Sequence, residues 1–87
     1  MKEIEFRIYL EQTNHTEKSI LSRISRLKTV ERSFHLNIDS IIFDKEKVIC
    51  LLDKLKEIDS KNQNLSNAVR KYYECMTNNV IEKNYKE

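Results

Sequence analysis

Neither glycine nor proline occurs among the 87 residues of this chain. Glycine is the usual residue at left-handed turn positions, and proline is the usual residue that fixes turns and ends helices. Tight β-hairpins depend on Asn-Gly or Asp-Gly pairs, so a hairpin-rich fold would lack its turns here. Helices tolerate the absence of both residues far better. We therefore expect an all-α fold.

The length allows one small domain. Charged residues make up 34% of the chain and hydrophobic residues 39%, which is a normal globular balance with a heavily charged surface. A domain of this size buries about 60–65% of its unfolded surface, so its stability is modest. We assign residues 1–83 to a single helical domain and residues 84–87 to a frayed polar tail.

The cysteines and histidines predict neither a disulfide framework nor a metal site. Cys50 and Cys75 lie far apart, and with His15 and His35 they match no compact zinc-ligand spacing. No apolar run approaches the ~18–20 residues that cross a bilayer. We expect a cytoplasmic protein with no cofactor, no membrane contact and no small-molecule substrate.

Residues 2–11 fit two patterns. Their hydrophobic residues alternate with polar ones as in a strand, at Ile4, Phe6, Ile8 and Leu10. A lone strand would have no partner, however, because no other segment alternates as well. Phe6, Tyr9 and Leu10 share one helical face, so we predict a short first helix.

The second helix is predicted to begin at Asn14 or Thr16, either of which is a good cap. Its apolar stripe has helical spacing and consists of Ile20, Ile24, Leu27, Val30 and Phe34, with Leu21 broadening it. Hydroxyl and basic side chains fall on the opposite face, at Lys18, Ser22, Ser25, Arg26, Thr29 and Ser33. Arg23 lies at the border between the two faces.

Two further helices follow a short apolar segment. Ile38, Ile41, Ile42 and Phe43 are expected to wedge into the core, and Asp44 is expected to cap a third helix. The buried stripe of this third helix is predicted to contain Val48, Leu51, Leu52, Leu55 and Ile58. Residues 60–64 read as a loop, with Asn64 as the cap of the last helix.

The last helix has a clear inner and outer face. The inner face is predicted to contain Leu65, Ala68, Val69, Tyr72, Tyr73 and Met76. The outer face is predicted to contain Asn67, Arg70, Lys71, Glu74 and Asn78.

Charge is distributed unevenly, although the net charge is only +2. Residues 16–34 contain five Lys or Arg against two Glu, and residues 60–87 contain five against three. The local distribution of charge matters more than its total for attracting a phosphate backbone. The weak total is equally compatible with an ordinary solvated surface.

Three short motifs occur in order along the chain: Phe6-Arg7-Ile8-Tyr9-Leu10, then Thr16-Glu17-Lys18-Ser19-Ile20 with Leu27, then Ser66-Asn67-Ala68-Val69-Arg70-Lys71-Tyr72-Tyr73. Together they resemble the N-terminal core-binding domain of tyrosine recombinases, the SAM-like domain of phage integrases. The sequence departs from that pattern at Arg23 and Cys75, where the family often has aromatic residues.

The resemblance implies a SAM-like bundle of four to five helices whose second and fourth helices lie near duplex DNA. On this basis the DNA contacts would come from Lys18, Ser19, Ser22, Arg26, Ser66, Asn67, Arg70 and Lys71. We add three neighbouring polar residues as further candidates: Arg23, Lys61 and Asn62. In some family members the arginine that matches Arg70 has a structural role.

The recombinase catalytic set is absent from this chain. The family uses a His-x-x-Arg motif, but Lys18 lies three positions after His15, and Ile38 lies three positions after His35. We therefore interpret the chain as a non-enzymatic DNA-binding module related to DNA integration and recombination. Two alternatives remain: a helical protein–protein or homodimer module, and an integrase fragment that has lost its activity.

Overall fold

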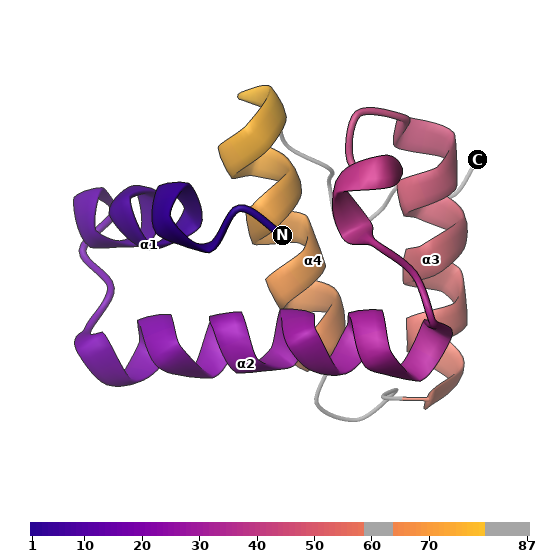
Figure 1. The fold of residues 1–87 in the computed structure, drawn as a ribbon, viewed down its shortest axis with the longest axis horizontal. Helices are drawn as coiled ribbons and strands as arrows, with labels where there is room; N and C mark the ends of the chain where they lie inside the picture. The colour runs from indigo at the N-terminus through magenta and orange to yellow at the C-terminus, as the bar shows by residue number, and fades with distance from the viewer. Residues whose placement is uncertain (59–63, 80–87) are drawn as a thin grey trace.

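The computed structural model describes residues 1–58 and 64–79. These residues contain helices and no strand, as expected from the composition (Figure 1). The elements are α1 (Glu3–Gln12), α2 (Glu17–Phe34), the short 3₁₀ helix η1 (Ile38–Ser40), α3 (Lys45–Ile58) and α4 (Asn64–Thr77). The all-α prediction is confirmed. The predicted loop at 60–63 and the predicted tail at 84–87 lie outside the described residues.

Helix α4 is the central element of the bundle. It packs against α1, α2 and α3, and α1 also packs against α2. In Figure 1, α2 runs along one edge, α1 lies over its first half, and α3 stands near its far end. The first half of α2 is therefore remote from α3, which leaves its outer side uncovered by any described element.

The core follows the predicted stripes closely. Its buried hydrophobic residues are Phe6, Leu10, Ile20, Ile24, Leu27, Val30, Ile38, Ile42, Val48, Leu51, Leu52, Leu55, Ala68, Val69, Tyr72 and Tyr73. Phe34, Ile41, Leu65 and Met76 are partly buried against this core.

Three predicted core residues are exposed instead. Leu21 is half exposed because it lies about 100° round α2 from Ile20, beyond the strip that meets α4. Phe43 follows the buried Ile42 in the turn before α3, and it projects outward. Ile58 is the last residue of α3 and is also exposed.

The predicted caps explain where two helices begin. The Thr16 hydroxyl accepts the backbone N–H of Ser19 at 3.2 Å and so caps α2. The Asp44 carboxylate accepts the backbone N–H groups of Glu46 and Lys47 at the start of α3. Asn64 was predicted as a cap, but it is the first helical residue of α4.

In the described part of the chain, left-handed turns form without glycine. Asn14, His35 and Asn78 have positive φ angles of 65°, 51° and 59°. Asparagine and histidine adopt this conformation more readily than most residues with a Cβ atom. His35 is the cap at the end of α2. Asn14 lies in the link between α1 and α2, so of the two predicted caps Thr16 is the one that caps α2.

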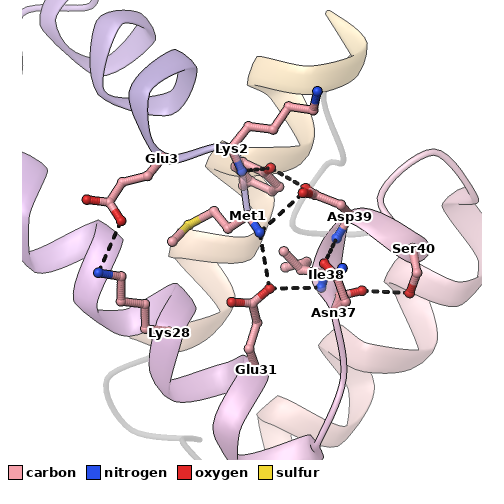
Figure 2. A network of polar contacts seen from close by, with 10 residues as sticks. Met1, Lys2, Glu3, Lys28, Glu31, Asn37, Ile38, Asp39 and Ser40 are labelled. Carbon is pink, nitrogen blue, oxygen red and sulfur yellow. Dashed lines mark hydrogen bonds and ion pairs between the residues drawn. The ribbon is translucent and has the colours of Figure 1, made fainter.

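A polar network ties the first two residues to the middle of the chain (Figure 2). The Met1 ammonium group pairs with Glu31 at 3.5 Å and with Asp39 at 3.2 Å. The same Glu31 carboxylate accepts the backbone N–H of Ile38 at 3.0 Å. The network therefore joins the chain start, α2 and η1.

Tyr72 extends this network to α4. Its hydroxyl donates to the Asp39 carboxylate and accepts the backbone N–H of Lys2 at 2.8 Å. Its ring meets Phe6 edge-on, with the ring centroids 5.2 Å apart. Burial, followed by the hydrogen bond to Asp39, raises the pKa of the Tyr72 hydroxyl. This tyrosine therefore packs its ring in the core and uses its polar tip to hold the chain start.

Candidate nucleic-acid interface

The first half of α2 presents a shallow polar hollow of about 200 Å³. It is lined by three cationic and three hydroxyl side chains: Thr16, Lys18, Ser19, Ser22, Arg23 and Arg26. Helical spacing brings them together, because residues three and four apart lie on one side of a helix. All the α2 residues predicted as DNA contacts line this hollow.

The cations of the hollow have no carboxylate at ion-pair distance among the described residues. Within residues 1–58 and 64–79, Lys18, Arg23 and Arg26 take part in no ion pair. Burial and then the charge of Arg26 lower the pKa of Arg23, and the charge of Glu74 partly opposes them. Positive charges are therefore held close together on the first half of α2.

Two other cations of α1 and α2 are paired outside the hollow. Arg7 of α1 forms an ion pair with Glu17 of α2, and Lys28 pairs with Glu3 at 3.1 Å. Both pairs lie along the flank where α1 and α2 meet. Glu17 therefore belongs to the seam between the helices and does not line the hollow.

Helix α4 contributes less to this surface than predicted. Arg70 was expected to point outward, but it is buried and donates to the Asn67 side-chain oxygen. Ser66 is also buried, and its hydroxyl has no hydrogen-bond partner among the described residues. Because α4 packs against three helices, little of its circumference stays free. Arg70 and Ser66 are therefore buried in this fold and do not form part of the exposed surface of α4.

Lys71 and Asn67 remain partly accessible on α4. The Lys71 ammonium pairs with Glu74 at 3.3 Å, and Glu74 accepts the Tyr9 hydroxyl at 3.4 Å. Burial and then the charge of Glu74 raise the pKa of Tyr9. The charge of Glu74 also acts on Arg23. Glu74 and its partner Lys71 are therefore close to the hollow.

The remaining predicted residues do not add to this surface. Lys61 and Asn62 lie outside the described residues. Cys50 is exposed, as the helical wheel predicts, and burial raises the pKa of the half-buried Cys75. No group of three or more histidine, cysteine or acidic residues in the described ranges is placed to hold a metal ion. The described helices include none that is long and apolar enough to cross a membrane.

A second hollow, of about 450 Å³, was not foreseen from the sequence. It lies between the end of α2 and α3, with an apolar floor and a charged rim. Its lining consists of Phe34, Leu36, Ile41, Asp44, Glu46, Lys47, Cys50, Leu51 and Lys54. The rim has equal numbers of lysines and carboxylates, so it favours neither sign of charge.

No protein-family model, curated protein or solved structure matches this chain. The resemblance to the integrase core-binding domain therefore rests on the three sequence motifs alone. Any functional argument must come from the surface itself.

Proposed function

We propose that this chain is a non-enzymatic module that binds duplex DNA through its phosphates. The observation that supports the proposal is the hollow on α2, where Lys18, Arg23 and Arg26 converge among hydroxyl groups without a carboxylate in the lining. Lysine and arginine contacts to phosphates supply the sequence-independent part of DNA affinity. Serine and threonine hydroxyls commonly add hydrogen bonds to the same oxygens.

Helix α4 has a secondary role in this proposal. Lys71 is near the α2 hollow because the charge of its partner Glu74 acts on Arg23, but Lys71 must exchange Glu74 for a phosphate. We therefore place the main contact on α2 rather than equally on both helices. The four cations of this surface are Lys18, Arg23, Arg26 and Lys71. Each phosphate that is contacted contributes a slope of about −0.9 to log K against log salt. The slope is therefore about −3.6 if each cation contacts its own phosphate, and about −1.8 if the three α2 cations share one phosphate and Lys71 contacts a second.

The proposal is tested by fluorescence anisotropy with a duplex of roughly 20 base pairs at 50 and 200 mM salt. We expect salt-sensitive binding, and we expect Lys18→Glu with Arg26→Glu to remove most of it. The matched control is Lys47→Glu with Lys54→Glu on α3, which makes the same change in net charge on exposed residues. Circular dichroism checks that both double variants are folded.

Two outcomes would refute DNA binding at this surface. One is the absence of binding to the duplex at 50 mM salt. The other is an equal loss of affinity in the α2 and α3 double variants, because it would show that only net charge matters.

A second candidate function is self-association or protein binding through α1. Ile4 and Ile8 are one turn apart on the outer side of α1, and Ile4 is 75% exposed. Light scattering tests this alternative. It needs a high protein concentration, about 100 μM, because an interface made by one helix face is small and typically supports only weak association. A dimer that Ile4→Lys with Ile8→Lys converts to a monomer would favour it. A monomeric wild-type chain would exclude self-association under those conditions.

A further inference from the structure

The hollow on α2 has the features of a discrete site rather than a diffuse basic face. Its lining comes from one short stretch, between the cap Thr16 and Arg26. The hollow has a volume of about 200 Å³ and is open to solvent, so it has room for one tetrahedral phosphate group.

The chemistry of the lining favours an oxyanion. Lys18, Arg23 and Arg26 are donors with no acceptor atoms, and the guanidinium groups match phosphate geometry. The hydroxyls of Ser19 and Ser22 add adaptable donors at the same hollow. The Thr16 hydroxyl already accepts the Ser19 N–H, so it has its O–H left to donate.

The charges around the hollow are also arranged for an incoming anion. Glu17 pairs with Arg7 on the other flank of α2, and Glu74 pairs with Lys71 on α4. Glu74 still acts on Arg23, so it is the internal carboxylate that an incoming anion has to outcompete. The first turn of α2 adds the positive end of the helix dipole to the three side-chain charges.

We infer that this hollow is a seat for a single phosphate group, held by Lys18, Arg23 and Arg26 with Ser19 and Ser22. The inference rests on the proposed function because it concerns the same surface, and it adds a ligand of defined chemistry and a stoichiometry of one. A phosphomonoester carries up to two negative charges, and a backbone phosphodiester carries one. The seat therefore prefers a terminal phosphate to an internal one.

The test is an NMR titration of the ¹⁵N-labelled chain with inorganic phosphate, with sodium chloride at matched ionic strength as the reference. We expect saturable shifts of the Ser19, Ser22 and Arg23 amide signals that chloride does not reproduce. Lys18→Gln and Arg26→Gln should each weaken phosphate binding up to about fivefold, the upper range for an exposed charge pair. Arg32→Gln, on the same helix outside the hollow, should leave binding unchanged.

The source of the phosphate is decided with two duplexes that differ only in a 5′-phosphate or a 5′-hydroxyl. Tighter binding of the phosphorylated duplex supports the preference for a terminal phosphate. Equal binding overturns that preference and identifies the backbone as the source. Absence of saturable phosphate shifts, or an equal loss in the Arg32→Gln variant, overturns the seat. If the duplex binds without such shifts, the seat is wrong and DNA binding stands. If phosphate saturates the site but the duplex does not bind, the phosphate seat stands and DNA binding is wrong.

Discussion

The polar sides of α2 and α4 look alike on a helical wheel, yet the fold uses them in opposite ways. On α2, Lys18 and Arg26 line an open hollow and have no ion-pair partner among the described residues. On α4, Arg70 is buried against Asn67, and Lys71 is paired with Glu74. The same residue types therefore stabilise the molecule on α4 and remain available to a ligand on α2.

The difference follows from position in the bundle. Helix α4 packs against three helices, whereas α2 packs chiefly against α1 and α4. A central helix has few directions in which a long side chain reaches water. A basic residue is thus a candidate for ligand binding only after the neighbours of its helix are known.

Charge reversal gives the sharpest test of this comparison. Arg70→Glu places a carboxylate in a buried position and should lower the free energy of unfolding by at least about 3 kcal/mol. Arg26→Glu should change it by less than about 1 kcal/mol, because this side chain is partly exposed. Urea denaturation followed by circular dichroism measures both. Equal stabilities for the two variants would mean that Arg70 has no structural role.

Removing one hydroxyl from α4 should have the next largest effect. Tyr72→Phe loses the hydrogen bonds to Asp39 and Lys2, and should cost about 1–2 kcal/mol at neutral pH. The control is Tyr9→Phe, which removes a longer hydrogen bond, 3.4 Å to Glu74, and should cost less.

Alkaline pH gives a second readout of Tyr72. The folded state raises its pKa above the ordinary value of 10.0, so the folded state holds the proton more tightly than the unfolded state. The resulting stability is complete below about pH 10 and is lost as the pH rises through the folded pKa. Stability should fall by up to about 1.4 kcal/mol per pH unit above pH 10. The Tyr72→Phe variant should fall less steeply, and an unchanged slope would contradict this assignment.

A smaller effect of opposite sign is expected at Ser66. Its hydroxyl is buried without a protein partner among the described residues, so Ser66→Ala should raise stability by about 1 kcal/mol. Ser22→Ala on the open face of α2 gains only the difference in helix propensity, roughly 0.5 kcal/mol or less. Thermal denaturation of both variants makes the comparison. A less stable Ser66→Ala chain would show that this hydroxyl is satisfied.

The smallest predicted effect concerns DNA affinity. Glu74→Gln frees Lys71 and removes a negative charge that acts on Arg23, so duplex binding should tighten by at most about fivefold. Glu57→Gln removes the same charge from α3, the helix that lies near the far end of α2 in Figure 1, and should change affinity less. Equal gains in the two variants would mean that the effect is not local.

The sequence predicted most of the fold because its signals are local. Thr16 and Asp44 cap helices through residues two or three positions away, and the core stripes follow from helical spacing. Leu21 and Arg70 were misplaced for one reason. A helical wheel gives the angle of a side chain, but it does not give the width of the strip that neighbouring helices cover.

The candidate site was predictable only in part. The cluster on α2 follows from spacing within one helix, which is why Ser22, Arg23 and Arg26 appear together as expected. The influence of Glu74 on Arg23 depends on how two helices cross, and no local pattern contains that information. The interaction of Tyr72 with Lys2 joins residues 70 positions apart, so it could not be predicted from local sequence patterns either.

That long-range link has a consequence for the order of assembly. The first helix is synthesised early, but the tyrosine that holds its leading residues arrives only with α4. Contacts of such large sequence separation form late because a long loop must close first. The polar network that joins Met1 and Lys2 to Tyr72 should thus be the last part of the domain to become protected from hydrogen exchange during refolding. Its protection would mark completion of the bundle.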